Sequence, residues 1–139
     1  MARIVRPPSG ASLRQRALRR LRQALQWPGD PGSAKDRQAY ALEQLTWVNE
    51  SVRETLEAWE KREYWVKAER FRIEWAWAAT LEPDLERALA AEDDGLLSET
   101  LAQLLVRLVQ TGVRADQTLQ PEAWRGAWKR LEARLTGHR

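Results

Sequence analysis

Carboxylates are the most numerous side chains in this sequence that could do chemistry. Eight glutamates fall in a stretch that has the composition of a helix: Glu43, Glu50, Glu54, Glu57, Glu60, Glu63, Glu69 and Glu74. Di-metal sites in helical bundles combine inward glutamates with Glu-x-x-His motifs, but the only histidine here is His138 and cysteine is absent. Most of these glutamates have basic neighbours at helical spacing, as Glu57 has in Lys61. The pattern therefore predicts a solvated, salt-bridged face and no metal site.

Hydroxyl side chains lack the partners that catalysis needs. A serine nucleophile is activated by a neighbouring base, and none of the serines has a candidate base of the usual kind nearby. The seven glycines are scattered, nearly all at expected turns or helix ends, so they form no phosphate-binding loop. We therefore expect a protein that is not an enzyme and that has no cofactor and no small-molecule substrate.

Basic residues are concentrated at the N-terminal end of the chain. Residues 1–29 contain seven arginines and no acidic residue, whereas residues 30–139 contain 16 basic and 20 acidic residues. This asymmetry favours a polyanionic partner, which is nucleic acid, an acidic protein face or, less readily, an anionic membrane surface. The expected contact residues are Arg14, Arg16, Arg19, Arg20 and Arg22. The alternative, equally compatible with the sequence, is that this segment docks on the protein's own acidic helix.

Tryptophan is abundant, with eight residues against one phenylalanine and two tyrosines. Its large apolar ring system and single N–H group suit both protein cores and protein interfaces. The tryptophans lie mostly among acidic residues, which favours core packing or a protein interface over stacking on nucleobases. The aromatic residues expected at such an interface are Tyr40, Trp47, Trp65 and Trp75.

Helices are the elements expected to position these side chains. Ala, Leu and Arg, which rank high in helix propensity, supply 58 of the 139 residues, whereas Val, Ile and Thr supply 16. The sequence therefore predicts an all-α fold, starting with a basic helix over 13–27 that has leucines on one face and arginines on another. The Pro- and Gly-rich segment 28–33 predicts a hinge. It divides the chain into a basic N-terminal segment, 1–33, and a helical core domain, 34–139.

One very long central helix is expected over 34–82, because that stretch contains neither Gly nor Pro. Such a helix would be about 70 Å long. Its apolar residues occupy several faces, which predicts burial on several sides. Pro83 is expected to end the helix, and the weak stretch 49–51 is where a kink is most expected.

Shorter helices over 83–91, 96–111 and 121–136 should fold back along the second half of the long helix and complete a small bundle. The last of them carries an amphipathic stripe that includes Trp124 and Trp128. We expect this stripe to pack on the face of the long helix formed by Tyr64, Phe71 and Trp75, since both stripes need burial.

These features together predict a non-enzymatic protein–protein interaction or assembly protein, such as a small helical adaptor or complex subunit. The alternative function is that of a nucleic-acid-associated protein using the Arg-rich N-terminal helix. Because the short helices cannot cover the whole length of the long one, we expect a dimer or a stable complex with another protein that buries Trp47 or Trp65. No stretch approaches the ~18 apolar residues of a membrane span and no apolar segment of a secretory signal follows Met1, so we expect a cytoplasmic protein.

Overall fold

The regular secondary structure of the described part of the chain is entirely helical, as the composition predicts. The computed structural model describes residues 10–29 and 31–137. In order along the chain, the elements are α1 (Gly10–Gln26), the 3₁₀ helix η1 (Pro31–Ser33), α2 (Ala34–Lys61), α3 (Trp65–Glu74), α4 (Ala76–Ala90), α5 (Asp94–Thr111), the 3₁₀ helix η2 (Pro121–Ala123) and α6 (Ala127–Thr136).

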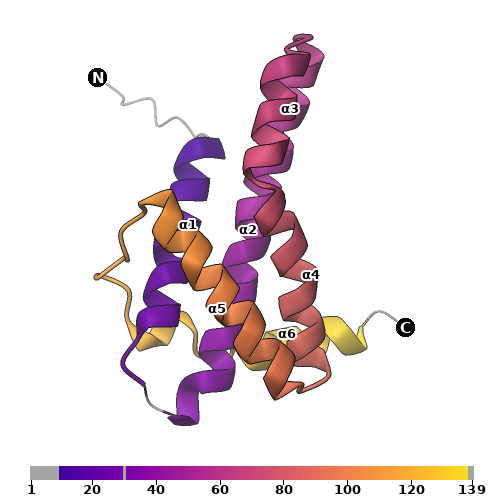
Figure 1. Ribbon diagram of the computed structural model, residues 1–139. Coiled ribbons are helices and arrows are strands. Elements are labelled where there is room, and N and C mark those ends of the chain that lie inside the picture. The colour runs from indigo at the N-terminus through magenta and orange to yellow at the C-terminus, as the bar shows by residue number, and fades with distance from the viewer. Residues whose placement is uncertain (1–9, 30, 138–139) are drawn as a thin grey trace, which may run out of the picture.

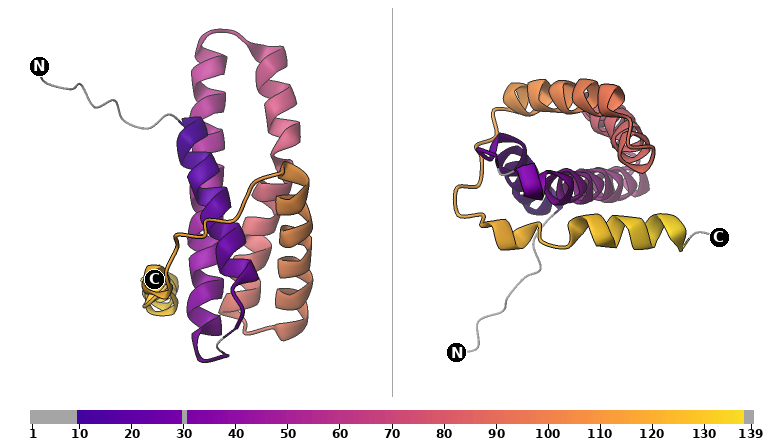
Figure 2. Two further views of the ribbon diagram at one scale, coloured as in Figure 1. Left: turned by 90° about the vertical axis from the view of Figure 1, so that its left-hand side faces the viewer. Right: turned by 90° about the horizontal axis from the view of Figure 1, so that it is seen from below.

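The helices form a bundle with one further helix lying across it. Helices α1, α2, α4 and α5 run up and down beside one another, and the upper part of α2 pairs with α3 in a hairpin that extends beyond the rest (Figure 1). Figure 2 shows α6 end-on when the other helices are seen lengthwise, so α6 crosses them. The largest fully buried side chains come from five segments: Leu18, Leu21, Leu42, Leu45, Val48, Leu85, Leu104, Leu108 and Trp124. The basic helix α1 is therefore part of the same hydrophobic core as the helices that follow it.

The prediction of a single long helix over 34–82 is wrong. Helix α2 ends at Lys61, Glu63 adopts a left-handed backbone conformation with φ of 62°, and the chain reverses into α3. The Tyr64 N–H donates to the Trp59 carbonyl at 2.9 Å, and the Glu63 N–H donates to the Glu60 carbonyl at 3.0 Å. These two hydrogen bonds form a Schellman motif, which usually has glycine at the left-handed position.

Packing favours this reversal over a continuous helix. It places Trp59 of α2 edge-on against Phe71 of α3, with ring centroids 5.0 Å apart. The ring centroid of Phe71 is in turn 6.2 Å from that of Trp75, which lies at the junction between α3 and α4. A straight helix would separate Trp59 from both rings and leave them exposed, because residues far apart along one helix cannot meet.

Pro83 lies inside α4 and does not end a helix, so no separate helix covers 83–91. Proline cannot donate to the carbonyl four residues earlier; here that residue is Ala79, which is exposed to water. On the inner side, Asn49 Nδ2 donates to the Ala78 carbonyl at 3.0 Å and to Glu82 Oε1 at 2.5 Å. This bridge ties α2 to α4 just before the proline, and α2 itself continues unbroken through the stretch where a kink was expected.

The C-terminal segment packs at the opposite end of α2 from the one expected. Trp124 lies against Trp27, with ring centroids 5.0 Å apart, and against Tyr40, with centroids 6.2 Å apart. It does not reach the face of Phe71. The single helix expected over 121–136 is also replaced by η2, a turn through Gly126 with φ of 79°, and α6.

Side chains of α2 fix this position of the C-terminal segment. The Asp36 carboxylate accepts from the Trp128 N–H at 2.9 Å and from the Gly126 N–H at 3.4 Å. An acidic group there satisfies free N–H groups at the start of α6 and interacts favourably with the helix dipole. About two turns further along α2, Glu43 accepts from Arg130 through Nε at 2.8 Å and Nη2 at 3.3 Å.

Candidate functional site

The predicted contact arginines on α1 have different environments, and Arg14 is buried. Its guanidinium carbon lies 4.9 Å from the ring centroid of Phe71 and 5.4 Å from that of Trp75, and Nη1 is 3.4 Å from Ser51 Oγ. Burial lowers the pKa of Arg14, and the charge of Glu74 partly offsets this. Arg14 thus joins α1 to the α2–α3 hairpin, and its guanidinium is covered by the chain itself.

Arg22 and Arg19 contact the connection between α5 and η2. Arg22 Nη1 donates to the Val113 carbonyl, and the Arg19 carbonyl accepts from the Asp116 N–H at 3.0 Å. The side chain of Arg19 remains exposed. Arg22 is therefore engaged in holding this connection on α1, whereas the guanidinium of Arg19 faces solvent.

Arg16 and Arg20 line a small groove between α1 and α2, with a volume of about 240 Å³. We call it the α1–α2 groove; its lining residues are Leu13, Arg16, Ala17, Arg20, Gln44 and Trp47. Among residues 10–29 and 31–137, no salt bridge reaches Arg16, Arg19 or Arg20. The structure thus brings two of the predicted arginines together with one of the predicted aromatic residues, Trp47.

The predicted interface aromatics divide into two buried and two exposed residues. Tyr40 and Trp75 belong to the chain's own hydrophobic core, and burial raises the pKa of the Tyr40 hydroxyl. Trp47 is 58% exposed and Trp65 is 59% exposed. Of the four predicted aromatic residues, Trp47 and Trp65 are thus the two whose rings are exposed and accessible to another molecule.

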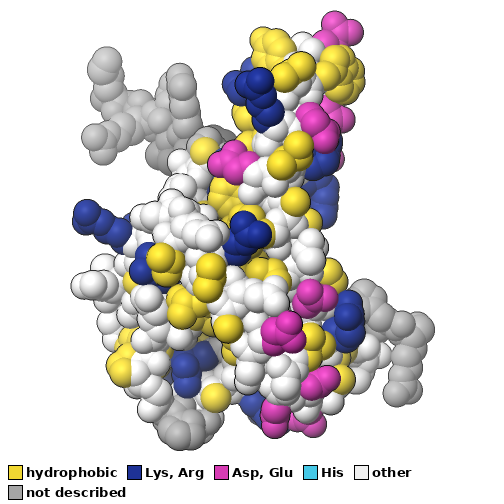
Figure 3. Space-filling view, in the orientation of Figure 1, with side chains coloured by type: hydrophobic (Ala, Val, Ile, Leu, Met, Phe, Trp, Pro, Cys, Tyr) yellow, Lys and Arg dark blue, Asp and Glu magenta, His cyan; other side chains and the backbone are white. Residues whose placement is uncertain are grey.

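The end of the α2–α3 hairpin carries a cluster of exposed apolar side chains. Tyr64, Trp65 and Val66, which we call the hairpin tip, are 49%, 59% and 67% exposed. Charged residues flank the cluster, with Glu63 before it and Lys67 after it. Figure 3 shows hydrophobic side chains at the end of the projecting hairpin, with charged ones around them.

Sequence reasoning selected Trp65 but not its two neighbours as interface residues. The signal was present, because three consecutive apolar residues on a helix point in three directions, and one packing face cannot cover them all. Gln44, which lines the α1–α2 groove, was also missed. Nothing in its sequence context distinguishes it from an ordinary polar residue.

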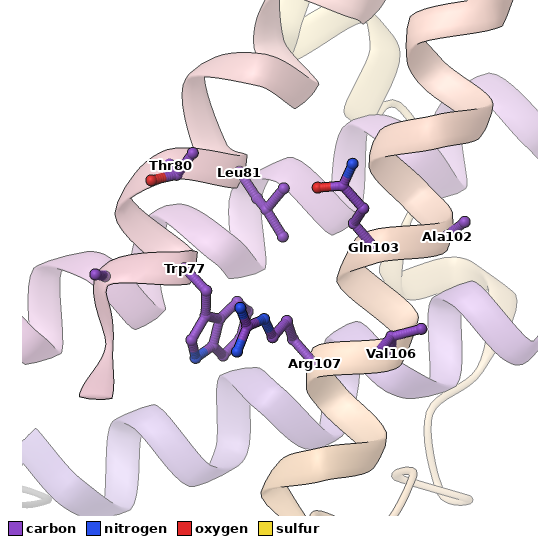
Figure 4. A pocket seen from close by; sticks show the side chains of 8 residues that line it. Trp77, Thr80, Leu81, Ala102, Gln103, Val106 and Arg107 are labelled. Carbon is purple, nitrogen blue, oxygen red and sulfur yellow. The ribbon is translucent and has the colours of Figure 1, made fainter. Parts of the chain in front are cut away.

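A second, larger groove lies between α4 and α5 and has a volume of about 570 Å³. In Figure 4, Trp77 of α4 and Arg107 of α5 point into the space between the two helices, and Leu81 and Val106 also line it. Its lining is mainly apolar, with Thr80 and Gln103 among the polar groups. The lining has no carboxylate and no histidine, so it offers no acid–base pair.

Other features of the described residues bear on the class of protein. Within them, no group of three or more His, Cys, Asp or Glu side chains could hold a metal ion. None of the helices that they form is long and apolar enough to cross a membrane. Comparison of the chain with family models, with curated proteins and with solved structures found no match.

Proposed function

We propose that this protein is a non-enzymatic interaction or assembly protein, a small helical adaptor or complex subunit that binds another protein chain through the hairpin tip. The observation that supports it is the exposure of Tyr64, Trp65 and Val66 together at the end of a projecting hairpin. The partner is either a second copy of this chain or a different protein.

The composition of the hairpin tip is typical of an interface. Contiguous apolar side chains on a surface mark sites of association, and Trp and Tyr are enriched among the residues that dominate binding energy. The charges of Glu63 and Lys67 provide the polar rim that surrounds such a centre. The reversal of the chain does not require the side chains of the hairpin tip, because the Schellman motif is formed by backbone groups alone.

The first test is self-association, measured by sedimentation velocity over a range of micromolar concentrations. We expect a concentration-dependent dimer that the double substitution Trp65→Ser with Val66→Ser abolishes. The free energy of unfolding should change by less than about 0.5 kcal/mol, because both side chains are exposed. The matched control is Val106→Ser with Val109→Ser on α5, which removes two exposed apolar side chains elsewhere and should leave the dimer intact.

If the protein is a monomer at every concentration, the partner is a different protein, and a second experiment tests for it. A photo-crosslinking amino acid at position 65 should then give a discrete adduct in cells of the native host, and the same group at position 106 should not. A monomer that also gives no position-65 adduct above the position-106 background would refute docking at the hairpin tip.

A further inference from the structure

We propose that the α1–α2 groove binds single-stranded nucleic acid, with Arg16 and Arg20 contacting phosphates and Trp47 stacking on a base. This inference goes beyond protein docking at the hairpin tip and concerns a different surface of the molecule. It rests on three properties of the groove: two arginines without a salt bridge, an exposed aromatic ring and a glutamine side chain in the lining.

Neither arginine of the groove forms a salt bridge with a described residue. Arg16 and Arg20 are one helical turn apart, about 6 Å along α1. A guanidinium presents a planar set of N–H donors that matches the oxygens of a phosphate. An anionic ligand would supply such acceptors.

One acidic group lies close enough to affect these arginines. Asp116 interacts electrostatically with Arg19 and Arg20, which helps to lower the pKa of the Asp116 carboxyl. Its carboxylate already accepts from the Thr118 N–H at 3.0 Å and from the Thr118 hydroxyl at 2.6 Å. Asp116 is thus held by its own loop, and it balances only part of the charge that the arginines carry.

Trp47 and Gln44 give the groove groups that suit a nucleobase. The indole of Trp47 is 58% exposed, although tryptophan is among the side chains with most apolar area to bury. Stacking a base on such a ring is a main source of affinity for single strands. Gln44, which lines the same groove, is 7% exposed and carries a side-chain amide. An amide has both donors and an acceptor, which is what the edge of an unpaired base requires.

The same geometry favours a single strand over other polyanions. In a duplex, each base face is covered by its neighbours in the stack, so the ring of Trp47 would find no partner. An anionic lipid surface offers phosphates to the arginines but no base to Trp47 and Gln44. The arginines and the ring line one groove of about 240 Å³, so a phosphate and an adjacent base can contact both.

The test is fluorescence anisotropy of a labelled oligothymidylate of ~12 nucleotides, titrated with the full chain. We expect binding at low salt that weakens on going from about 50 to about 200 mM salt. Trp47→Leu should weaken binding about tenfold, while Trp47→Phe, which keeps an aromatic face, should recover most of it. Trp47 is exposed, so circular dichroism should show all variants folded.

The salt dependence separates the groove from general attraction to a basic surface. Arg16→Gln and Arg20→Gln should each reduce the slope of log affinity against log salt by about 0.7, the value for one lost phosphate contact. Arg19→Gln is the matched control, because Arg19 lies on the same helix and is exposed but does not line the groove. It should leave the slope unchanged.

Four results would overturn the proposal. They are no binding of the oligonucleotide at low salt, equal binding of a duplex of the same length, no effect of Trp47→Leu, and an Arg19→Gln effect as large as that of Arg16→Gln. Vesicles of anionic lipid that bind as tightly as the oligonucleotide, and do so without dependence on Trp47, would point to a membrane surface instead.

Discussion

Arg14 shows that a residue of one type in one helix can have a structural role while its neighbours remain available for binding. Its guanidinium lies over the rings of Phe71 and Trp75 and reaches Ser51 of α2. A desolvated cation on aromatic faces contributes up to about 2 kcal/mol. Arg14 is therefore a tie between α1 and the base of the hairpin, whereas neither Arg16 nor Arg20 forms a salt bridge with a described residue.

Arg14→Ala should reduce the free energy of unfolding by about 2 kcal/mol, because it removes the cation–π contacts and the packing of the side chain. Arg14→Met keeps most of the apolar packing and removes the buried charge, so it should cost less than about 1 kcal/mol. Arg19→Ala, at an exposed position on the same helix, should change stability by less than about 0.5 kcal/mol. Urea denaturation measures all three. If Arg14→Ala and Arg19→Ala reduced the free energy of unfolding equally, Arg14 would not stabilise the contact between α1 and the hairpin.

At the scale of the elements, two helices end in the same way without glycine. Glu63 after α2 and Glu92 after α4 both have positive φ, 62° and 50°. Beyond Glu92, the Asp93 N–H donates to the Ala88 carbonyl at 3.0 Å, as the Tyr64 N–H does to that of Trp59. A left-handed conformation costs a non-glycine residue roughly 1–2 kcal/mol. Tertiary contacts must offset that free energy, and at the first turn the contact between Trp59 and Phe71 is one of them.

Glu63→Gly should stabilise the protein by about 0.5–1 kcal/mol, since the relief of backbone strain exceeds the added entropy of the unfolded chain. Glu63→Val should destabilise it by about 1–2 kcal/mol, because a β-branched residue tolerates positive φ least. Glu57→Gly is the control: at an exposed position inside α2, the same glycine should destabilise by about 1 kcal/mol. Thermal melts of the three variants check the signs. A Glu63→Gly variant that melts below the parent protein would show that the turn carries no strain.

At the scale of the whole molecule, the C-terminal segment packs across the side of α2, in the half of α2 that is nearer its connection to α1. Trp124 is 2% exposed and contacts both Trp27, just after α1, and Tyr40 of α2. Asp36 and Glu43 of α2 then hold the start of α6 through hydrogen bonds. Segments at the two ends of the described chain are thereby joined through α2, and the opposite end of α2 is left to the projecting hairpin.

Trp124→Ala should lower the free energy of unfolding by about 3–5 kcal/mol, the usual loss when a fully buried large aromatic residue is truncated. Trp65→Ala should change it by less than about 0.5 kcal/mol, because that ring is exposed. Guanidinium denaturation followed by circular dichroism compares the two. A small loss for Trp124→Ala would mean that the C-terminal segment does not stabilise the bundle.

Local sequence was sufficient to determine the helical class of this protein and several element ends. Abundant Ala, Leu and Arg predict helix through intrinsic propensity. Gly112 ends α5 with φ of 73°, as a C-terminal glycine should. The same reasoning, that a helix apolar on several faces has more apolar surface than one neighbour can cover, named four aromatic residues. Trp47 and Trp65 are exposed, whereas Tyr40 and Trp75 are buried in the core.

Only the tertiary structure decided where the chain reverses, which arginines are free and where the last helix packs. Glu63 lacks the glycine signal of a reversal, and Pro83 carries a stop signal that Asn49 and solvent exposure of Ala79 override. Arg14 and Arg16 have the same side chain two positions apart, yet one lies in the core and the other at a groove. Propensity acts over a few residues, whereas burial of aromatic rings and pairing of charges depend on contacts between distant segments. Those contacts are strong enough to outweigh local preferences of about 1–3 kcal/mol.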